Sequence, residues 1–134
     1  MTWLLDTVAL SEARKKHPNP GFVAWVSGIE VRQIHTSVLC IGEVRRGVER
    51  LPVGEKRAAF GRWLDFELPG YLEHRILDVD ASVAHAWGRM GALRSLPPVD
   101  SLIASTALVH GLTVVTRNTR DFDGLGVPVL NPWT

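Results

Sequence analysis

Long apolar runs are absent from the 134-residue sequence, and cysteine is almost absent. No stretch approaches the roughly 18 consecutive apolar residues that cross a bilayer, so we expect no membrane span. The N-terminal segment MTWLLDTVAL lacks a basic start and carries an acid at position 6, which favours a first strand over a signal peptide. Cys40 is the only cysteine, so an internal disulfide is excluded and we expect a reducing, cytoplasmic location.

An excess of one charge is also absent, because 15 basic residues face 14 acidic ones and the net charge is +1. This balance neither demands nor excludes a nucleic-acid partner. A composition of 46% hydrophobic and 22% charged residues predicts one globular domain over residues 1–134. Basic residues nevertheless form local clusters. Each cluster either binds along the phosphate backbone of a nucleic acid or is ordinary solvated surface. These clusters are 14–17, 45–46 with Arg50, 56–57, and Arg117 with Arg120.

Short apolar segments alternate with segments of helical periodicity along the chain. The expected strands are 2–5, 33–37, 75–79, 112–116 and an edge strand at 127–130. The expected helices are 7–16, 22–27, 39–51, 56–68, 81–94 and 100–110, with Pro69-Gly70 ending the fourth and Gly111 the last. This alternation predicts a single α/β domain with a mainly parallel sheet. Such sheets bind ligands at the carboxyl ends of their strands.

Four acids fall where this architecture places a ligand. Asp6 directly follows the first strand, and Asp121 ends the loop that follows strand 112–116. Asp100 and Glu43 lie near the starts of two helices. Gathered carboxylates repel one another unless a cation compensates them, and an oxygen-only ligand set favours Mg²⁺ or Mn²⁺ over zinc.

Each of these acids also has an ordinary structural interpretation. Asp6 and Asp100 are suitable N-caps for the helices that follow them. Glu43 lies three residues before Arg46, so the two can form a surface ion pair. Asp121 fits a turn. Spacing alone therefore leaves both interpretations open.

Other candidate sites are weaker. Asp78-Val79-Asp80 resembles the nucleophile motif of haloacid-dehalogenase-type phosphatases, but it does not follow the first strand and no lysine lies beyond Lys56. Asp80 is better explained as the N-cap of the helix 81–94. The five histidines show no metal-ligand spacing, and the five tryptophans are spread as core or interface residues.

The chain as a whole resembles PIN-domain proteins, specifically the VapC/FitB-like toxins of bacterial type II toxin–antitoxin systems. The resemblance runs from end to end, and the ordered acids together with the segment TRNTRDF make it specific. The matching segments are LLDT (4–7), LSEARK (10–15), SVLCIGEVRRGVERLP (37–52), ILDVDASVAHAWGRM (76–90), PPVDSLIASTALVHGLTVVTRNTRDF (97–122) and GLGVPVLNPW (124–133).

The resemblance implies a parallel sheet flanked by helices and a Mg²⁺-dependent endoribonuclease. Carried over by position, the family's acidic site falls on Asp6, Glu43, Asp100 and Asp121. Among these, Asp6 and Asp100 are the implied metal ligands. Two further residues of the motif around Asp121 are expected to support the site by hydrogen bonding, namely Thr116 and Asn118.

The resemblance also implies partners. A cognate antitoxin is expected to lay an amphipathic helix in an apolar groove and to direct a basic side chain at the acids, and through it the complex would bind operator DNA. Homodimerisation would place two acidic sites across a shared groove. Basic residues are expected to steer RNA, with Arg14, Lys15, Arg117 and Arg120 as the candidates.

One alternative keeps the fold without the chemistry: a non-catalytic partner in an antitoxin–DNA autorepressor complex. Such a protein would be expected to lose one or more acids, whereas all four are present. The sequence departs from the family pattern at Val8, where many members have asparagine, and in the stretch 91–98, which is shorter than usual. Both departures predict altered metal affinity or substrate access.

Overall fold

The sheet at the centre of the molecule is built from five short parallel strands. The computed structural model describes residues 1–134, and its strands are β1 (Trp3–Leu5), β2 (Ile34–Ser37), β3 (Ile76–Leu77), β4 (Thr113–Val115) and β5 (Val129–Leu130). Their order is β3-β2-β1-β4-β5, which leaves β1 in the middle between β2 and β4. The predicted α/β class with a parallel sheet is therefore confirmed.

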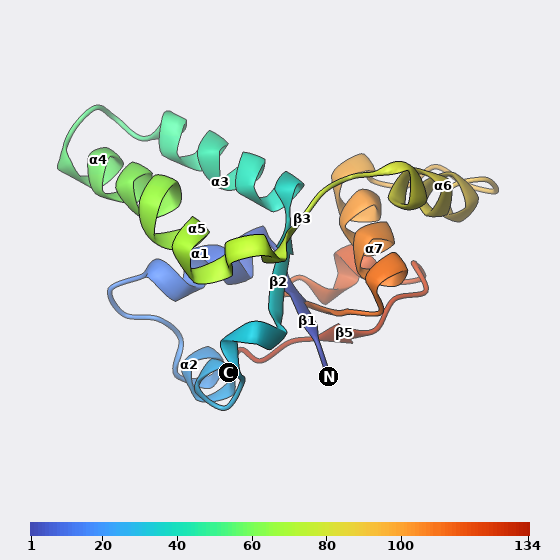
Figure 1. Cartoon of the computed structure of the whole chain (residues 1–134), viewed down its shortest axis with the longest axis horizontal. Coiled ribbons are helices and arrows are strands. Elements are labelled where there is room, and N and C mark those ends of the chain that lie inside the picture. Colours follow the sequence, from blue (N-terminus) through green and yellow to red (C-terminus); the bar gives the residue numbers. More distant parts are fainter.

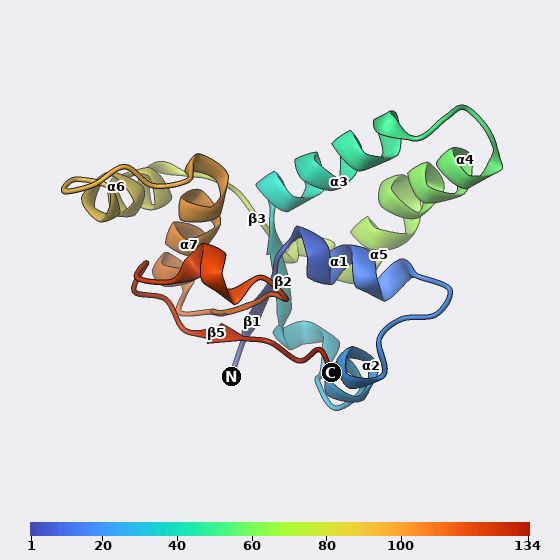
Figure 2. The same cartoon turned by 180° about the vertical axis from the view of Figure 1, so that it is seen from behind.

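Helices lie on both sides of this sheet. To one side lie α6 (Ala81–Met90) and α7 (Pro98–His110), and to the other α1 (Thr7–Arg14), α3 (Val38–Arg50), α4 (Glu55–Arg62) and α5 (Leu68–Leu72) (Figures 1 and 2). The helix α2 (Pro20–Ser27) lies beside the C-terminus (Figure 2). Single-turn helices at 31–33, 63–67, 73–75 and 119–122 complete the fold. No helix is long and apolar enough to traverse a bilayer.

Apolar side chains of the central strands and the inner helix faces form one buried cluster. Leu4, Val114 and Val115 are completely buried because β1 and β4 are covered on both faces. Cys40 lies in the same cluster, and burial raises the pKa of its thiol to about 11. Cys40 is therefore a core residue, and a thiol with a raised pKa is a poor nucleophile.

Several helix boundaries follow the local signals. The side chain of Asp80 caps α6 by accepting from the backbone N–H of Val83 at 3.0 Å. Ser37 caps α3 in the same way, and Gly111 ends α7 in the left-handed conformation, with φ of 67°. Asp80 therefore has the capping role that the sequence suggested.

Several predicted boundaries differ from the structure, and three of them lie at proline or glycine. Pro69-Gly70 does not end the fourth helix: a π-helical turn at Trp63–Glu67 leads into α5, where Pro69 occupies the first turn and needs no N–H donor. The helix expected over 81–94 ends at Met90, because Gly91 caps it. The last long helix begins at Pro98 rather than Asp100, so Asp100 lies inside the first turn and is not its N-cap.

The C-terminal segment is held by a buried carboxylate on α1. Glu12 is 3% exposed and accepts from the backbone N–H of Asn19 at 2.8 Å, from Lys15 Nζ at 3.0 Å and from Trp133 Nε1 at 3.2 Å. Desolvation raises its pKa, but the hydrogen bonds outweigh that effect and leave the pKa below its ordinary value. The rings of Trp133 and Phe22 lie 5.1 Å apart, which packs this segment against α2.

We predict that Glu12→Gln lowers the free energy of unfolding by about 1 to 3 kcal/mol, because an amide satisfies fewer of the three donors. Urea denaturation at pH 7 measures the change. The matched control is Glu49→Gln, an exposed ion-pair residue whose replacement costs less than about 0.5 kcal/mol. Because the pKa of Glu12 is lowered in the fold, the difference from wild type shrinks as the pH falls below 4.5. An equal loss for both variants would contradict the buried role of Glu12.

Candidate acidic site

Asp6 lies at the carboxyl end of the central strand and begins the first helix. Its carboxylate accepts from the backbone N–H of Ala9 at 2.9 Å and so caps α1, while its own backbone N–H donates to the carbonyl of Val115 at 3.1 Å. The side chain is buried, at 7% exposure. The pKa of Asp6 is raised to about 6. Burial is the largest cause, hydrogen bonding partly offsets it, and the negative charges of Asp100 and Glu43 add to the rise. Capping and proximity to the other acids therefore coexist in one side chain.

Thr116 and Asn118 support this arrangement in different ways. Thr116 is completely buried after β4 beside Asp6, and its side chain lowers the pKa of that carboxyl, which favours the ionised form. Its hydroxyl oxygen accepts from the backbone N–H of Asn118 at 2.9 Å. Asn118 thus orients the loop through its backbone, and its side chain lies at the surface. The loop after β4 is tied to the end of β1 by these contacts.

The remaining acids approach Asp6 from three elements. Asp100, half-buried in the first turn of α7, has its pKa raised by burial first and then by the charges of Asp121 and Glu43. Asp121 lies exposed in the single turn 119–122, which packs against α7. Glu43 lies in α3, which also contacts α7. The charges of Asp100 and Glu43 act on Asp6, and the charge of Asp121 acts on Asp100, so the four predicted acids lie near one another at the carboxyl edge of the sheet.

The donor set fits a hard divalent cation. Burial and then mutual repulsion raise the pKa of Asp6 and Asp100, and no cation of the chain offsets that repulsion, because Asp6, Asp100 and Asp121 form no ion pair. No three side chains of the histidine, cysteine, aspartate and glutamate types converge closely enough to enclose a metal ion. Mg²⁺ does not require such a cage, because it binds one or two carboxylates and keeps several waters.

Glu43 is the only one of the four acids that forms an ion pair within the chain. Its Oε1 accepts from the hydroxyl of Thr7, and its Oε2 accepts from Arg46 Nη2 at 3.3 Å. The ion pair suggested by the sequence spacing is therefore present, together with proximity to the other acids. The contact with Thr7 was not predicted, although Thr7 directly follows Asp6 in the motif LLDT.

The four candidate RNA-steering residues divide into two pairs. Arg117 and Arg120 are exposed and line a polar hollow of about 340 Å³ together with Asp121. The other two are engaged at the far end of α1: the guanidinium of Arg14 lies 3.9 Å from the centre of the Phe60 ring, and Lys15 pairs with Glu12. Arg117 and Arg120 are therefore better placed for a substrate at the acids.

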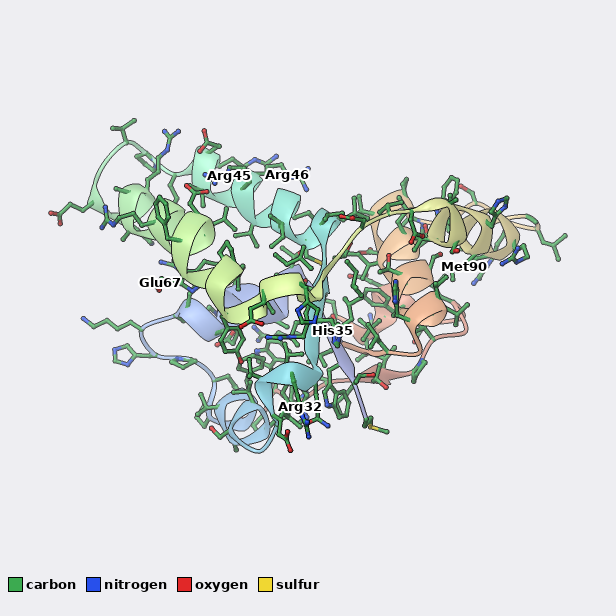
Figure 3. The ribbon with its side chains drawn as sticks, in the orientation of Figure 1. Arg32, His35, Arg45, Arg46, Glu67 and Met90 are labelled. Carbon is green, nitrogen blue, oxygen red and sulfur yellow. The ribbon has the colours of Figure 1, made fainter.

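A second, apolar hollow of about 410 Å³ opens between α1, α2 and α5. Its single charged lining residue is Glu67, which forms no ion pair in the chain. Figure 3 shows Glu67 beside α5, on the side of the molecule away from α6 and α7. The apolar lining residues are Leu5, Leu10, Ala13, Pro18, Phe22, Val23, Val26, Ile34, Trp63, Leu68 and Leu72.

The two departures from the family pattern, Val8 and the stretch 91–98, lie at or near the carboxyl edge of the sheet. Val8 is half-buried in the first turn of α1 and supplies no polar group beside Asp6. The stretch 91–98 is mostly exposed and joins α6 to α7. Their effects on metal affinity and access stay predictions.

Comparison with known proteins agrees with the fold. The family model of the PIN domain matches residues 3–127, and the chain belongs to this family. It is 33% identical to VapC ribonuclease Y4jK of Sinorhizobium fredii, over 97% of this chain and 96% of the relative. It is also 33% identical to toxin FitB of Neisseria gonorrhoeae, over 97% of each chain.

Solved structures give the same result. The crystal structure of FitAcB from Neisseria gonorrhoeae has a TM-score of 0.91 and 32% identity, covering 98% of this chain and 99% of the other. FitAB bound to an IR36 DNA fragment has a TM-score of 0.90 and 30% identity, covering 99% and 96%. The resemblance to VapC/FitB-like PIN-domain toxins is confirmed.

Proposed function

We propose that this protein is a Mg²⁺-dependent endoribonuclease toxin of a type II toxin–antitoxin module. The observation that carries the proposal is the gathering of Asp6, Asp100, Glu43 and Asp121 at the carboxyl edge of the sheet, where the first two have raised pKa values. Retention of all four acids favours catalysis over a purely structural partner role. Relatives named VapC ribonuclease support RNA as the substrate.

In this proposal Asp6 and Asp100 hold the metal, with Glu43 and Asp121 acting beside them. A bound Mg²⁺ supplies Lewis-acid activation of water and neutralises charge on the phosphodiester. Thr116 keeps Asp6 oriented and ionised by hydrogen bonding. Arg117 and Arg120 attract the phosphate backbone from the polar hollow beside Asp121.

The proposed partner is a cognate antitoxin, because the solved relatives include FitAB and VapBC assemblies, some of them bound to DNA. The apolar hollow between α1, α2 and α5 suits the apolar face of a partner helix. Operator DNA would be bound through the antitoxin rather than by this chain. Because RNA is its substrate, we place this activity in the cytoplasm.

We also propose a homodimer. Large apolar side chains are exposed on and between α6 and α7, which pack against each other beside the acidic site. A second copy covering them would bring two acidic sites near a shared groove. These side chains are Trp87, Leu93, Leu108 and Val109.

The proposed function predicts that the purified protein cleaves cellular RNA with Mg²⁺ or Mn²⁺ and stops when EDTA removes the metal. Gel electrophoresis of total RNA and of a transfer-RNA pool measures the cleavage, and the co-purified antitoxin should suppress it. Cleavage that continues in EDTA would refute the metal-dependent mechanism. Restoration by added Mg²⁺ is the control that EDTA has not denatured the protein.

A further inference from the structure

Among the four acids, only Glu43 has a cationic partner within the chain. The guanidinium of Arg46 donates to its Oε2 at 3.3 Å, and the hydroxyl of Thr7 donates to its Oε1. Both oxygens of this carboxylate are thus engaged, by groups from two different helices.

The two contacts differ in strength. Thr7 is fixed in the first turn of α1, next to the buried Asp6, and its bond to Glu43 is partly buried. The Arg46 side chain is 57% exposed, and 3.3 Å is longer than the roughly 2.7–2.9 Å of a strong charge-assisted bond. Because exposed ion pairs are weak, the Arg46 contact opens easily while the Thr7 contact persists.

Arg46 also has room for a ligand on its other side. It lines a hollow of about 320 Å³ together with Glu43 and Val99, the residue directly before Asp100. This hollow lies between α3 and α7, at the edge of the acidic site. Arg45, the residue before Arg46, projects from the same helix (Figure 3). Its guanidinium instead donates a hydrogen bond to Asp65, and Arg45 lines a different hollow.

We propose that Arg46 binds a backbone phosphate of RNA, and that Glu43 holds its guanidinium beside the acids until RNA arrives. The inference rests on the proposed function and extends its substrate site. Four carboxylates repel a polyanion, so a cation at their rim favours its approach. A guanidinium binds phosphate through paired N–H donors, and its departure leaves Glu43 hydrogen bonded to Thr7.

The test compares RNA binding by the wild type and Arg46→Gln. Binding is measured by fluorescence anisotropy in EDTA over a range of salt concentrations. The probe is a labelled RNA of mixed sequence and about 20 nucleotides, long enough to cover the binding site of one or two small domains. We expect Arg46→Gln to bind about fivefold more weakly, with a salt slope lower by about 0.7, the value for one lost contact to single-stranded nucleic acid. Arg46→Lys should keep the slope, because it keeps the charge, and lose only part of the affinity.

Arg45→Gln is the matched control, since it removes the same charge one residue away without touching the hollow beside Asp100. Equal affinity and slope for the wild type and Arg46→Gln would overturn the inference, and so would an equal loss in Arg45→Gln. If the wild type binds and cleaves RNA but Arg46→Gln binds equally well, only this inference fails. If the wild type neither binds nor cleaves RNA, the proposed function fails with it.

Discussion

Asp6→Asn is expected to abolish metal-dependent RNA cleavage and, at the same time, to stabilise the metal-free protein. The rate should fall about a thousandfold or more, which corresponds to about 4 kcal/mol of activation free energy. Asparagine cannot supply the negative charge that holds the metal in the proposed mechanism. Its side-chain oxygen can still accept from the N–H of Ala9, so the cap of α1 is retained.

The gain in stability follows from the raised pKa of Asp6. Burial and the charges of Asp100 and Glu43 raise this pKa to about 6, so at pH 7.5 the fold must hold an ionised carboxylate that it disfavours. A neutral amide removes that cost, and we expect a gain of about 1 to 3 kcal/mol in EDTA. Thermal denaturation should show a Tm higher by about 3 to 8 °C.

Asp80→Asn is the matched control for this prediction. Asp80 caps α6 through the N–H of Val83 as Asp6 caps α1, but it lies outside the acidic site. We expect this control to cleave RNA at the wild-type rate and to gain no stability. If Asp6→Asn cleaves at the wild-type rate, or melts below the wild type in EDTA, Asp6 does not have the role assigned here.

The second large effect is a pH dependence governed by the same carboxylate. Cleavage should fall about tenfold per pH unit below about 6, because protonated Asp6 no longer carries the charge that binds the metal. The pH dependence is measured as the single-turnover cleavage rate at one fixed, sub-saturating Mg²⁺ concentration. The range from pH 5 to pH 8 extends about one pH unit below the pKa and about two above it. Raising the Mg²⁺ concentration should move the midpoint to lower pH, because metal and proton compete for one carboxylate.

The stability of the metal-free protein should change with pH in the opposite direction. A carboxylate with a raised pKa in the fold binds its proton more tightly when folded, so its cost appears as the pH rises from the ordinary value of 3.8 through about 6. In EDTA, the difference in unfolding free energy between Asp6→Asn and the wild type should therefore widen from pH 4.5 to about pH 6 and then stay level up to pH 7.5. If the pKa of Asp6 were lowered instead, Asp6→Asn would be less stable than the wild type at pH 7.5, and that deficit would shrink as the pH falls.

Local signals predicted most of the fold because the deciding atoms are close together in sequence. The β-branched run at 113–115, the capping carboxylate of Asp80 and the left-handed Gly111 each act within a few residues. The predictions failed where proline and glycine permit two outcomes. Pro69 and Pro98 both lie in first helical turns, where proline is tolerated. Pro69 had been expected to end a helix, and the helix that begins at Pro98 had been expected to begin at residue 100.

The sequence by itself determined the order of the strands and helices, the four acids and their placement after strands or near helix starts. It could not determine how each acid is held, because that depends on residues far apart in the chain. Packing alone buries Asp6, brings Thr7 to Glu43 across 36 positions and places Arg14 on Phe60. Burial and neighbouring charge set the pKa values of the site, and both arise only when the elements pack together.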